Sequence, residues 1–333
     1  MSINLTPGKI AGLTAVSDHR GVIAAVAMDQ RGLLKNMLAR ELGVSEPPAG
    51  MMSEFKQLVA RTLTKHASSI LLDLEYGLDA AKQINGKGLL LAYEHAGYSP
   101  DHPERLPSLR EGWYVLRLKE TGASAIKVLV YYTPFEKESV NDRKKAWLER
   151  IGAECRAVDM PYFLEFLGYD VHGEGETSIE YAHCKPEIVF ESTREFTRDR
   201  YGADVLKIEV PVQMAYVEGT RAFKGQKVHT RAEAMELMRA AAALTAKPIV
   251  YLSAGVSSEV FVETLELVSE SGVEFHGVLC GRATWQDGVP VYVKQGVAAL
   301  EEWLNTTGAQ NVRNVNKVLE SAHPWFEARS MKT

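Results

Sequence analysis

The run SAIKVLVYY (124–132) is apolar on almost every consecutive position and carries three β-branched residues. This pattern is typical of a strand that is buried on both faces, as in a parallel sheet. Seven further runs bounded by turn residues, most of them with the same character, lie at 21–30, 68–77, 88–94, 161–169, 204–212, 247–255 and 275–285. Eight buried strands are therefore predicted.

Helical patterns lie between these runs, with apolar residues spaced three and four positions apart at 52–67, 109–123 and 231–246. Strand and helix thus alternate along the whole chain, and eight such units favour a closed (β/α)8 TIM barrel over an open doubly wound sheet. No linker divides the chain, so we predict an α/β fold with a single domain over residues 1–333. Within it, 1–20 form an N-terminal segment, 297–317 the last barrel helix, and 318–333 a C-terminal extension.

Composition limits the possible partners. The chain has 333 residues, a formal net charge of −5 and no clustered positive excess, which argues against binding nucleic acid or an anionic membrane surface. No apolar run approaches the roughly 20 residues of a membrane span. The three cysteines form no CxxC pair, and the start has no signal-peptide pattern. We therefore expect a cytoplasmic protein.

Three of the apolar runs are interrupted by a charge at an interior position. These residues are Lys127, Glu165 and Lys207. A charge there is costly unless it is paired or functional. One interpretation is a structural ion-pair cluster that fills the barrel centre. The other is catalytic: a lysine beside a second cation in low-dielectric surroundings becomes a nucleophile toward a ketone, and a carboxylate moves the protons.

The motif AMDQRG (27–32) ends the first predicted strand with three polar residues. Asp29 has two interpretations of equal weight, a cap for the following helix and an orienting residue in the site. Gln30 is predicted to hydrogen-bond a sugar hydroxyl, and Arg31 to pair with an acid at the barrel mouth.

The last two strands end in LSAGVSSE (252–259) and LCGRATW (279–285), and the loops after strands seven and eight commonly bind phosphate in barrels. Glycines let backbone N–H groups approach an anion, and arginine offers a bidentate fork. The phosphate candidates are Ser253, Gly255, Gly281 and Arg282. The alternative is that the glycines serve tight turns and Arg282 pairs with a surface carboxylate.

Taken together, six blocks resemble the class I tagatose-1,6-bisphosphate aldolases, in the order and over nearly the whole length of that family. The blocks are AMDQRG, AIKVLVYY, FLEFLGYD, VLKIEVPV, LSAGVSSEVF and LCGRATWQDGV. The resemblance implies a TIM barrel that cleaves tagatose 1,6-bisphosphate reversibly, without metal or other cofactor, to dihydroxyacetone phosphate and glyceraldehyde 3-phosphate. Fructose 1,6-bisphosphate, a C4 epimer, is implied as a second substrate.

The resemblance also implies a role for each candidate residue. Lys207 matches the Schiff-base lysine, Glu165 the acid/base carboxylate and Lys127 the lysine beside it. Asp29 and Gln30 match the pair that lines the ketose site. The residues around the phosphate of the dihydroxyacetone phosphate half are matched by Ser253, Gly255, Gly281 and Arg282. Arg31 and Lys294 are two candidate cations for the remote phosphate, and a homo-oligomer is implied as well.

Three rival functions remain open. A related class I aldolase acting on sulfofructose 1-phosphate or deoxyribose phosphate would share the lysine chemistry. A sugar-phosphate sensor on the same fold would bind without turnover. A metal-dependent aldolase would need clustered ligands at strand ends, but His276 opens its strand at the wrong end, and His95, His172 and His183 are expected in or near loops.

Overall fold

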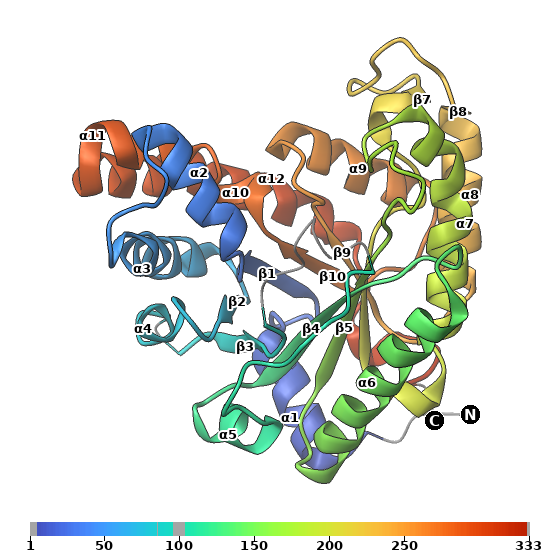
Figure 1. The fold of residues 1–333 in the computed structure, drawn as a ribbon, viewed down its shortest axis with the longest axis horizontal. Coiled ribbons are helices and arrows are strands. Elements are labelled where there is room, and N and C mark those ends of the chain that lie inside the picture. Colours follow the sequence, from blue (N-terminus) through green and yellow to red (C-terminus); the bar gives the residue numbers. More distant parts are fainter. Residues whose placement is uncertain (1–4, 85, 96–103, 332–333) are drawn as a thin grey trace.

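A computed structural model describes residues 5–84, 86–95 and 104–331 of the chain. All eight predicted strands are present, and they pair in parallel to close a barrel (Figure 1). In order around the barrel they are β1 (Ile23–Met28), β2 (Ser69–Asp73), β3 (Gly88–Ala92), β4 (Ala125–Tyr131), β5 (Tyr162–Leu167), β6 (Val205–Ile208), β9 (Ile249–Leu252) and β10 (Gly277–Cys280). The predicted (β/α)8 barrel is confirmed.

Two separate apolar cores account for the continuous apolar character of the strands. Within β4, Ile126, Val128 and Val130 belong to the core between the barrel and its helices. Ala125, in the other phase, belongs to the smaller core inside the barrel. Successive side chains of a strand point to opposite faces, so an inner residue and an outer residue alternate. Lys127 shares the phase of Ala125 and therefore points inward.

The helices surround the barrel, except for α1, which lies at its amino-terminal end (Figure 1). They are α1 (Pro7–Val16), α2 (Gly32–Leu42), α3 (Met51–Leu63), α4 (Leu78–Ala81), α5 (Val115–Glu120), α6 (Glu138–Ala157), α7 (Ile179–Phe196), α8 (Arg231–Ala243), α9 (Ser258–Glu270), α10 (Arg282–Trp285), α11 (Gly288–Trp303) and α12 (Ala309–Val318). A short parallel pair, β7 (Val217–Glu218) and β8 (His229–Thr230), lies in the connection after β6.

One helix prediction was wrong in extent, and another was confirmed. The helix expected over 109–123 is only α5, because Leu109 forms an isolated bridge with Glu94 and Gly112 adopts a left-handed φ of 72°. The last helix, expected over 297–317, is found: Gly296 has a non-helical φ of 83° and divides α11, and the helical run after it continues through a short π-helix into α12, which ends at Val318. No helix in the described part of the chain is long and apolar enough to cross a membrane.

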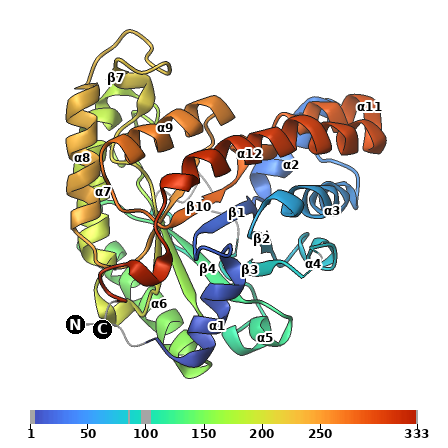
Figure 2. The ribbon, with the colours of Figure 1, turned by 180° about the vertical axis from the view of Figure 1, so that it is seen from behind.

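Both terminal segments pack at the amino-terminal end of the barrel (Figure 2). Leu13 and Val16 of α1 and Trp325 of the C-terminal extension join the apolar core inside the barrel. Residues 1–4 and 332–333 of these two segments lie outside the described residues. Because this end is filled with apolar side chains, an inward-facing polar site has room only at the carboxyl end of the strands.

Candidate active site

A cavity of about 300 Å³ opens at the carboxyl end of the barrel. Among its lining residues are ten of the eleven candidates from the sequence: Lys207, Glu165, Lys127, Asp29, Gln30, Arg31, Ser253, Gly255, Gly281 and Arg282. Six strands supply these residues, which meet because parallel strands place their carboxyl ends at one face of the barrel. Sequence and structure therefore agree on the location of the candidate site.

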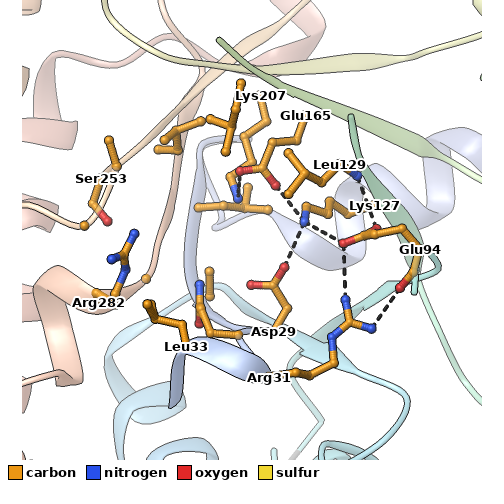
Figure 3. A pocket seen from close by; sticks show the side chains of 18 of the residues that line it. Asp29, Arg31, Leu33, Glu94, Lys127, Leu129, Glu165, Lys207, Ser253 and Arg282 are labelled. Carbon is orange, nitrogen blue, oxygen red and sulfur yellow. Dashed lines mark hydrogen bonds and ion pairs between the residues drawn. The ribbon is translucent and has the colours of Figure 1, made fainter. Parts of the chain in front are cut away.

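The three charged residues of the middle strands are buried and joined by ion pairs (Figure 3). Glu165 lies between the lysines: its Oε1 is 2.8 Å from Nζ of Lys207, and its Oε2 is 2.6 Å from Nζ of Lys127. Glu165 and Lys207 are direct neighbours in the register of β5 and β6. The structural interpretation predicted such pairing, but these residues line an open cavity rather than fill the barrel.

Lys127 is surrounded by carboxylates and is only 1% exposed. Besides Glu165, its Nζ contacts Oδ2 of Asp29 at 2.8 Å and Oε1 of Glu94 at 3.0 Å. Burial lowers the pKa of Lys127, but the three negative charges raise it well above its ordinary value. Lys127 therefore stays cationic and supplies a fixed positive charge one carboxylate away from Lys207.

Asp29 is an electrostatic partner of Lys127 and does not cap a helix. The N-cap residue of α2 is Arg31, and no side chain caps this helix. Burial raises the pKa of Asp29, but the charges of Lys127 and Lys207 lower it well below its usual range. Within the described structure, Oδ1 of Asp29 and Oε1 of Gln30 are buried acceptors without a hydrogen-bond partner. Both atoms suit the hydroxyl groups of a ligand in the cavity.

Glu94 is a site residue that the sequence analysis did not identify. It lies two residues beyond β3, in the inward phase of Leu90 and Ala92. Burial raises its pKa. Its backbone carbonyl accepts a hydrogen bond of 2.8 Å from Nη1 of Arg31, and its Oε1 lies 3.6 Å from Nη2 of the same arginine. The expected pairing of Arg31 with an acid at the barrel mouth is thus confirmed, with Glu94 as the acid.

Ser253 and Arg282 lie on the opposite side of the cavity from Glu94 (Figure 3). Ala254 and Gly255 follow Ser253 with φ values of 48° and 80°, a turn in which the backbone stays close to Arg282. A Cβ on Gly255 would come within 2.3 Å of the guanidinium nitrogens. Arg282 takes part in none of the ion pairs among the described residues, so its expected alternative partner, a surface carboxylate, is not found there.

The backbone near Arg282 also favours the binding of an anion. Helix α9 begins at Ser258 with Ser257 as its N-cap, where the positive end of the helix dipole lies. Gly281 precedes Arg282, and a Cβ there would lie 3.0 Å from Nε2 of Gln30. Burial lowers the pKa of Arg282, yet an arginine remains charged in proteins. This side of the cavity can hold a phosphate.

Neither cation considered for a second phosphate stands free in the cavity. Lys294 is an exposed residue of α11 that pairs with Glu41 at 3.4 Å, and it does not line the cavity. Arg31 lines the cavity but is held by Glu94. A remote phosphate would thus meet Arg31 only in competition with that carboxylate.

The histidines are placed largely as expected. His276 directly precedes β10, is 3% exposed and accepts a hydrogen bond of 3.1 Å from the backbone N–H of Ile249. His183 lies on an exposed part of α7 rather than in a loop. Over the described residues, no group of three or more histidine, cysteine or carboxylate side chains is arranged to hold a metal ion.

Comparisons with known proteins identify the family of this chain. The model of the DeoC/LacD family aldolases matches residues 23–287. Tagatose 1,6-diphosphate aldolase of Listeria monocytogenes serotype 4a (strain HCC23) is 48% identical over 97% of this chain and 95% of its own length. The enzyme of the same name from Lactococcus lactis subsp. lactis is 47% identical over 97% and 99%.

One solved structure supports the fold alone. Fructose-bisphosphate aldolase from Plasmodium falciparum, in complex with TRAP and a small-molecule inhibitor, aligns with a TM-score of 0.66. The alignment covers 96% of this chain and 97% of that one, at 14% sequence identity. At this identity the likeness extends to the barrel and not to the substrate.

Proposed function

This chain belongs to the DeoC/LacD family of aldolases, and on that premise we propose that it cleaves tagatose 1,6-bisphosphate through a Schiff base on Lys207. The products are dihydroxyacetone phosphate and glyceraldehyde 3-phosphate, and the reaction is reversible. The observation that carries the proposal is the position of Glu165, which contacts both buried lysines at the wall of the cavity.

Imine formation uses Lys207 as the nucleophile. Its Nζ attacks the C2 ketone of the open-chain ketose, and Glu165, 2.8 Å away, accepts the proton that the amine releases. Glu165 then returns this proton to the carbinolamine hydroxyl, which leaves as water, so that a protonated imine and a free carboxylate remain. Lys127 remains charged on the far side of Glu165 and keeps that carboxylate oriented between the two nitrogens.

Carbon–carbon cleavage then uses the imine as an electron sink. The C4 hydroxyl loses its proton to Glu165, the C3–C4 bond breaks, and the electron pair moves into the imine to form an enamine. Glyceraldehyde 3-phosphate leaves as the aldehyde. The enamine takes a proton at C3, and water hydrolyses the resulting imine to release dihydroxyacetone phosphate and restore Lys207.

The remaining lining residues account for binding. The unpartnered acceptors of Asp29 and Gln30 would receive hydrogen bonds from ketose hydroxyls. Arg282, with the backbone around Gly255, would hold the phosphate of the dihydroxyacetone half on the opposite side of the cavity from Glu94. Tagatose is chosen because the curated relatives at 47–48% identity carry that name, and fructose 1,6-bisphosphate differs from it only at C4.

We also propose that the protein is cytoplasmic. Cys155, Cys184 and Cys280 are free thiols in the structure, which supports a reducing cytoplasm. Fractionation of the cells that make this protein, followed by immunodetection, would check the location, and recovery outside the cytoplasmic fraction would contradict it.

The decisive experiment is reductive trapping. The protein is incubated with dihydroxyacetone phosphate and sodium borohydride in the presence of a chelator, and any adduct is located by peptide mass spectrometry. We expect one reduced adduct on Lys207. The absence of an adduct, or adducts scattered over surface lysines, would overturn the Schiff-base mechanism. Parallel assays of tagatose and fructose 1,6-bisphosphate, with triose phosphate release coupled to NADH oxidation, test the choice of substrate.

A further inference from the structure

A fully buried ion pair lies just behind the cavity and has no part in the chemistry described above. Lys56 of α3 pairs with Asp73 at the end of β2, and both side chains are 0% exposed. Neither residue lines the cavity. A buried pair costs desolvation free energy and is often no more stabilising than apolar residues of the same size, so its contacts deserve an explanation beyond stability.

The ammonium group of Lys56 is shared among three acceptors. Besides the carboxylate of Asp73, it donates hydrogen bonds to the backbone carbonyls of Met28, at 2.8 Å, and Gln30, at 2.9 Å. These two carbonyls flank Asp29 on either side. All three donors of the lysine are thus used, and two of them hold the backbone just before Asp29 and just after Gln30.

Lys56 holds this backbone at a point where hydrogen bonds between strands no longer do so. Pairing of β1 with β2 ends at Met28, and pairing of β1 with β10 ends at Val26. Asp29 and Gln30 therefore lie beyond the strand ladder, and the helix that follows has no side-chain cap. Their position depends on contacts from outside the sheet, and Lys56 provides two of them.

Asp73 is itself held firmly by the loop that follows β2. Its Oδ1 accepts hydrogen bonds of 2.8 Å from the backbone N–H groups of Glu75 and Tyr76, which leaves Oδ2 for Lys56. The loop then passes so close that a Cβ on Gly77 would lie 2.5 Å from the carbonyl oxygen of Asp73. The carboxylate is a fixed anchor for the lysine.

We propose that Lys56 and Asp73 are positioning residues for the aldol reaction, which hold the backbone at 28–30 so that Asp29 and Gln30 face the bound ketose. The inference rests on the proposed function. Small misplacements of a group that orients the substrate lower the rate of the chemical step strongly. Loss of this support should therefore reduce kcat more than it raises KM.

The test uses the charge-neutral double variant Lys56→Met/Asp73→Asn. Asparagine keeps an acceptor for the N–H groups of Glu75 and Tyr76, while methionine fills the space of the lysine without donating a hydrogen bond. We expect kcat for tagatose 1,6-bisphosphate to fall on the order of 10- to 100-fold with KM changed less than about threefold. A double variant with the kcat of the wild type would overturn the inference.

A matched control is available at the other end of the barrel. Lys9 of α1 is buried and pairs with both carboxylate oxygens of Asp204 at 2.8 Å, and Asp204 also accepts a hydrogen bond from Tyr162 N–H. The variant Lys9→Met/Asp204→Asn makes the same chemical change far from the cavity. We expect it to lower the melting temperature and to leave kcat within about twofold of the wild type. An equal loss of kcat in both double variants would show that global loosening, and not positioning, is the cause.

A coupling experiment separates positioning from a general structural effect. If the pair acts through Asp29, the double replacement should cause much less further loss of kcat in an Asp29→Ala background than in the wild type. Additive losses would overturn the inference. If the double variant does not fold, Asp73→Asn alone takes its place, with an expected threefold or greater loss of kcat and the same lack of additivity.

Wild-type turnover distinguishes this inference from the function it depends on. A wild-type protein that cleaves no ketose bisphosphate would overturn the proposed function and the inference with it. An active wild type, combined with a folded double variant of equal kcat, would overturn the positioning role alone.

Discussion

Glu165 lies 2.8 Å from Lys207, within reach for a proton to pass directly between carboxylate and amine. The same carboxylate contacts Lys127 at 2.6 Å through its other oxygen. One residue can thus exchange protons with the proposed nucleophile, Lys207, while the charge of Lys127 keeps it in place.

Replacing Lys207 with methionine should abolish cleavage and leave the fold intact. An unbranched apolar side chain occupies the same space in the inward phase, but it cannot form an imine. We expect kcat/KM to fall by a factor on the order of 10⁴ or more, with a melting temperature within about 5 °C of the wild type.

A suitable control is Lys247→Met. Lys247 is also a buried lysine, but it precedes β9 and donates to the carbonyl of Ala203 at 2.8 Å, away from the cavity. This variant should keep its activity even if it is less stable. Cleavage at the wild-type rate by Lys207→Met would contradict the assignment of the nucleophile.

Glu165→Gln should slow proton transfer more than imine formation. Glutamine keeps hydrogen-bonding atoms between the two lysines, but it cannot accept a proton at the pH of the assay. General acid–base catalysis contributes roughly 10²- to 10⁴-fold, and we expect a loss of kcat in that range. Single-turnover kinetics with borohydride quenching would measure imine formation and product release separately, and an unchanged rate of product release would count against the role of Glu165.

Asp29 should make the stability of the protein depend on pH in the acid range. Its folded pKa lies below the unfolded value of 3.8, so its contribution to stability is complete above that pH. As the pH falls below about 4, toward the folded pKa, this contribution is lost. A single carboxyl group can change the slope of the unfolding free energy against pH by at most about 1.4 kcal/mol per pH unit.

Asp29→Asn should therefore be less stable than the wild type at pH 7 and show a flatter decline below pH 4. Urea unfolding at a series of pH values between 7 and 3 measures both quantities. Asp79→Asn is the matched control, because Asp79 is an exposed carboxylate that pairs with Lys82 on the surface. Parallel curves for the wild type and Asp29→Asn would show that Asp29 is not held by the lysines.

Arg282→Met should weaken the binding of phosphorylated ligands. A hydrogen bond to a charged group contributes about 2 kcal/mol, which corresponds to roughly a 30-fold rise in Kd for dihydroxyacetone phosphate. Isothermal titration calorimetry gives this value directly. Dihydroxyacetone, which lacks the phosphate, is the control ligand and should bind both proteins equally weakly. A Kd unchanged by the substitution would place the phosphate elsewhere.

Much of this site could be predicted from the sequence, because a charge inside an apolar strand is conspicuous. Lys127, Glu165 and Lys207 each interrupt a run whose other residues are buried. Glu94 was missed because it follows the strand, where acidic residues are common. Its only signal is that it continues the inward phase of Leu90 and Ala92.

The buried pair of Lys56 and Asp73 could not be predicted in this way. Lys56 lies in an amphipathic helix, where a lysine ordinarily faces solvent, and its burial depends on packing against the end of β1, 26 to 28 residues away. The predicted length of α5 was wrong for a related reason. The apolar spacing over 109–123 does not reveal the bridge between Leu109 and Glu94, which forms between distant segments.

The alternation of inner and outer residues along each strand has a consequence for how such a barrel can change. In β4 and β5 the outward residues, such as Val128 and Leu164, pack in the core between the barrel and its helices, whereas inward ones near the carboxyl end, such as Lys127 and Glu165, line the candidate site. Along one strand, residues that pack against the helices thus alternate with residues that line the candidate site. Substitutions at the inward positions can therefore change the substrate, while the outward positions, left unchanged, keep the packing of the barrel against its helices.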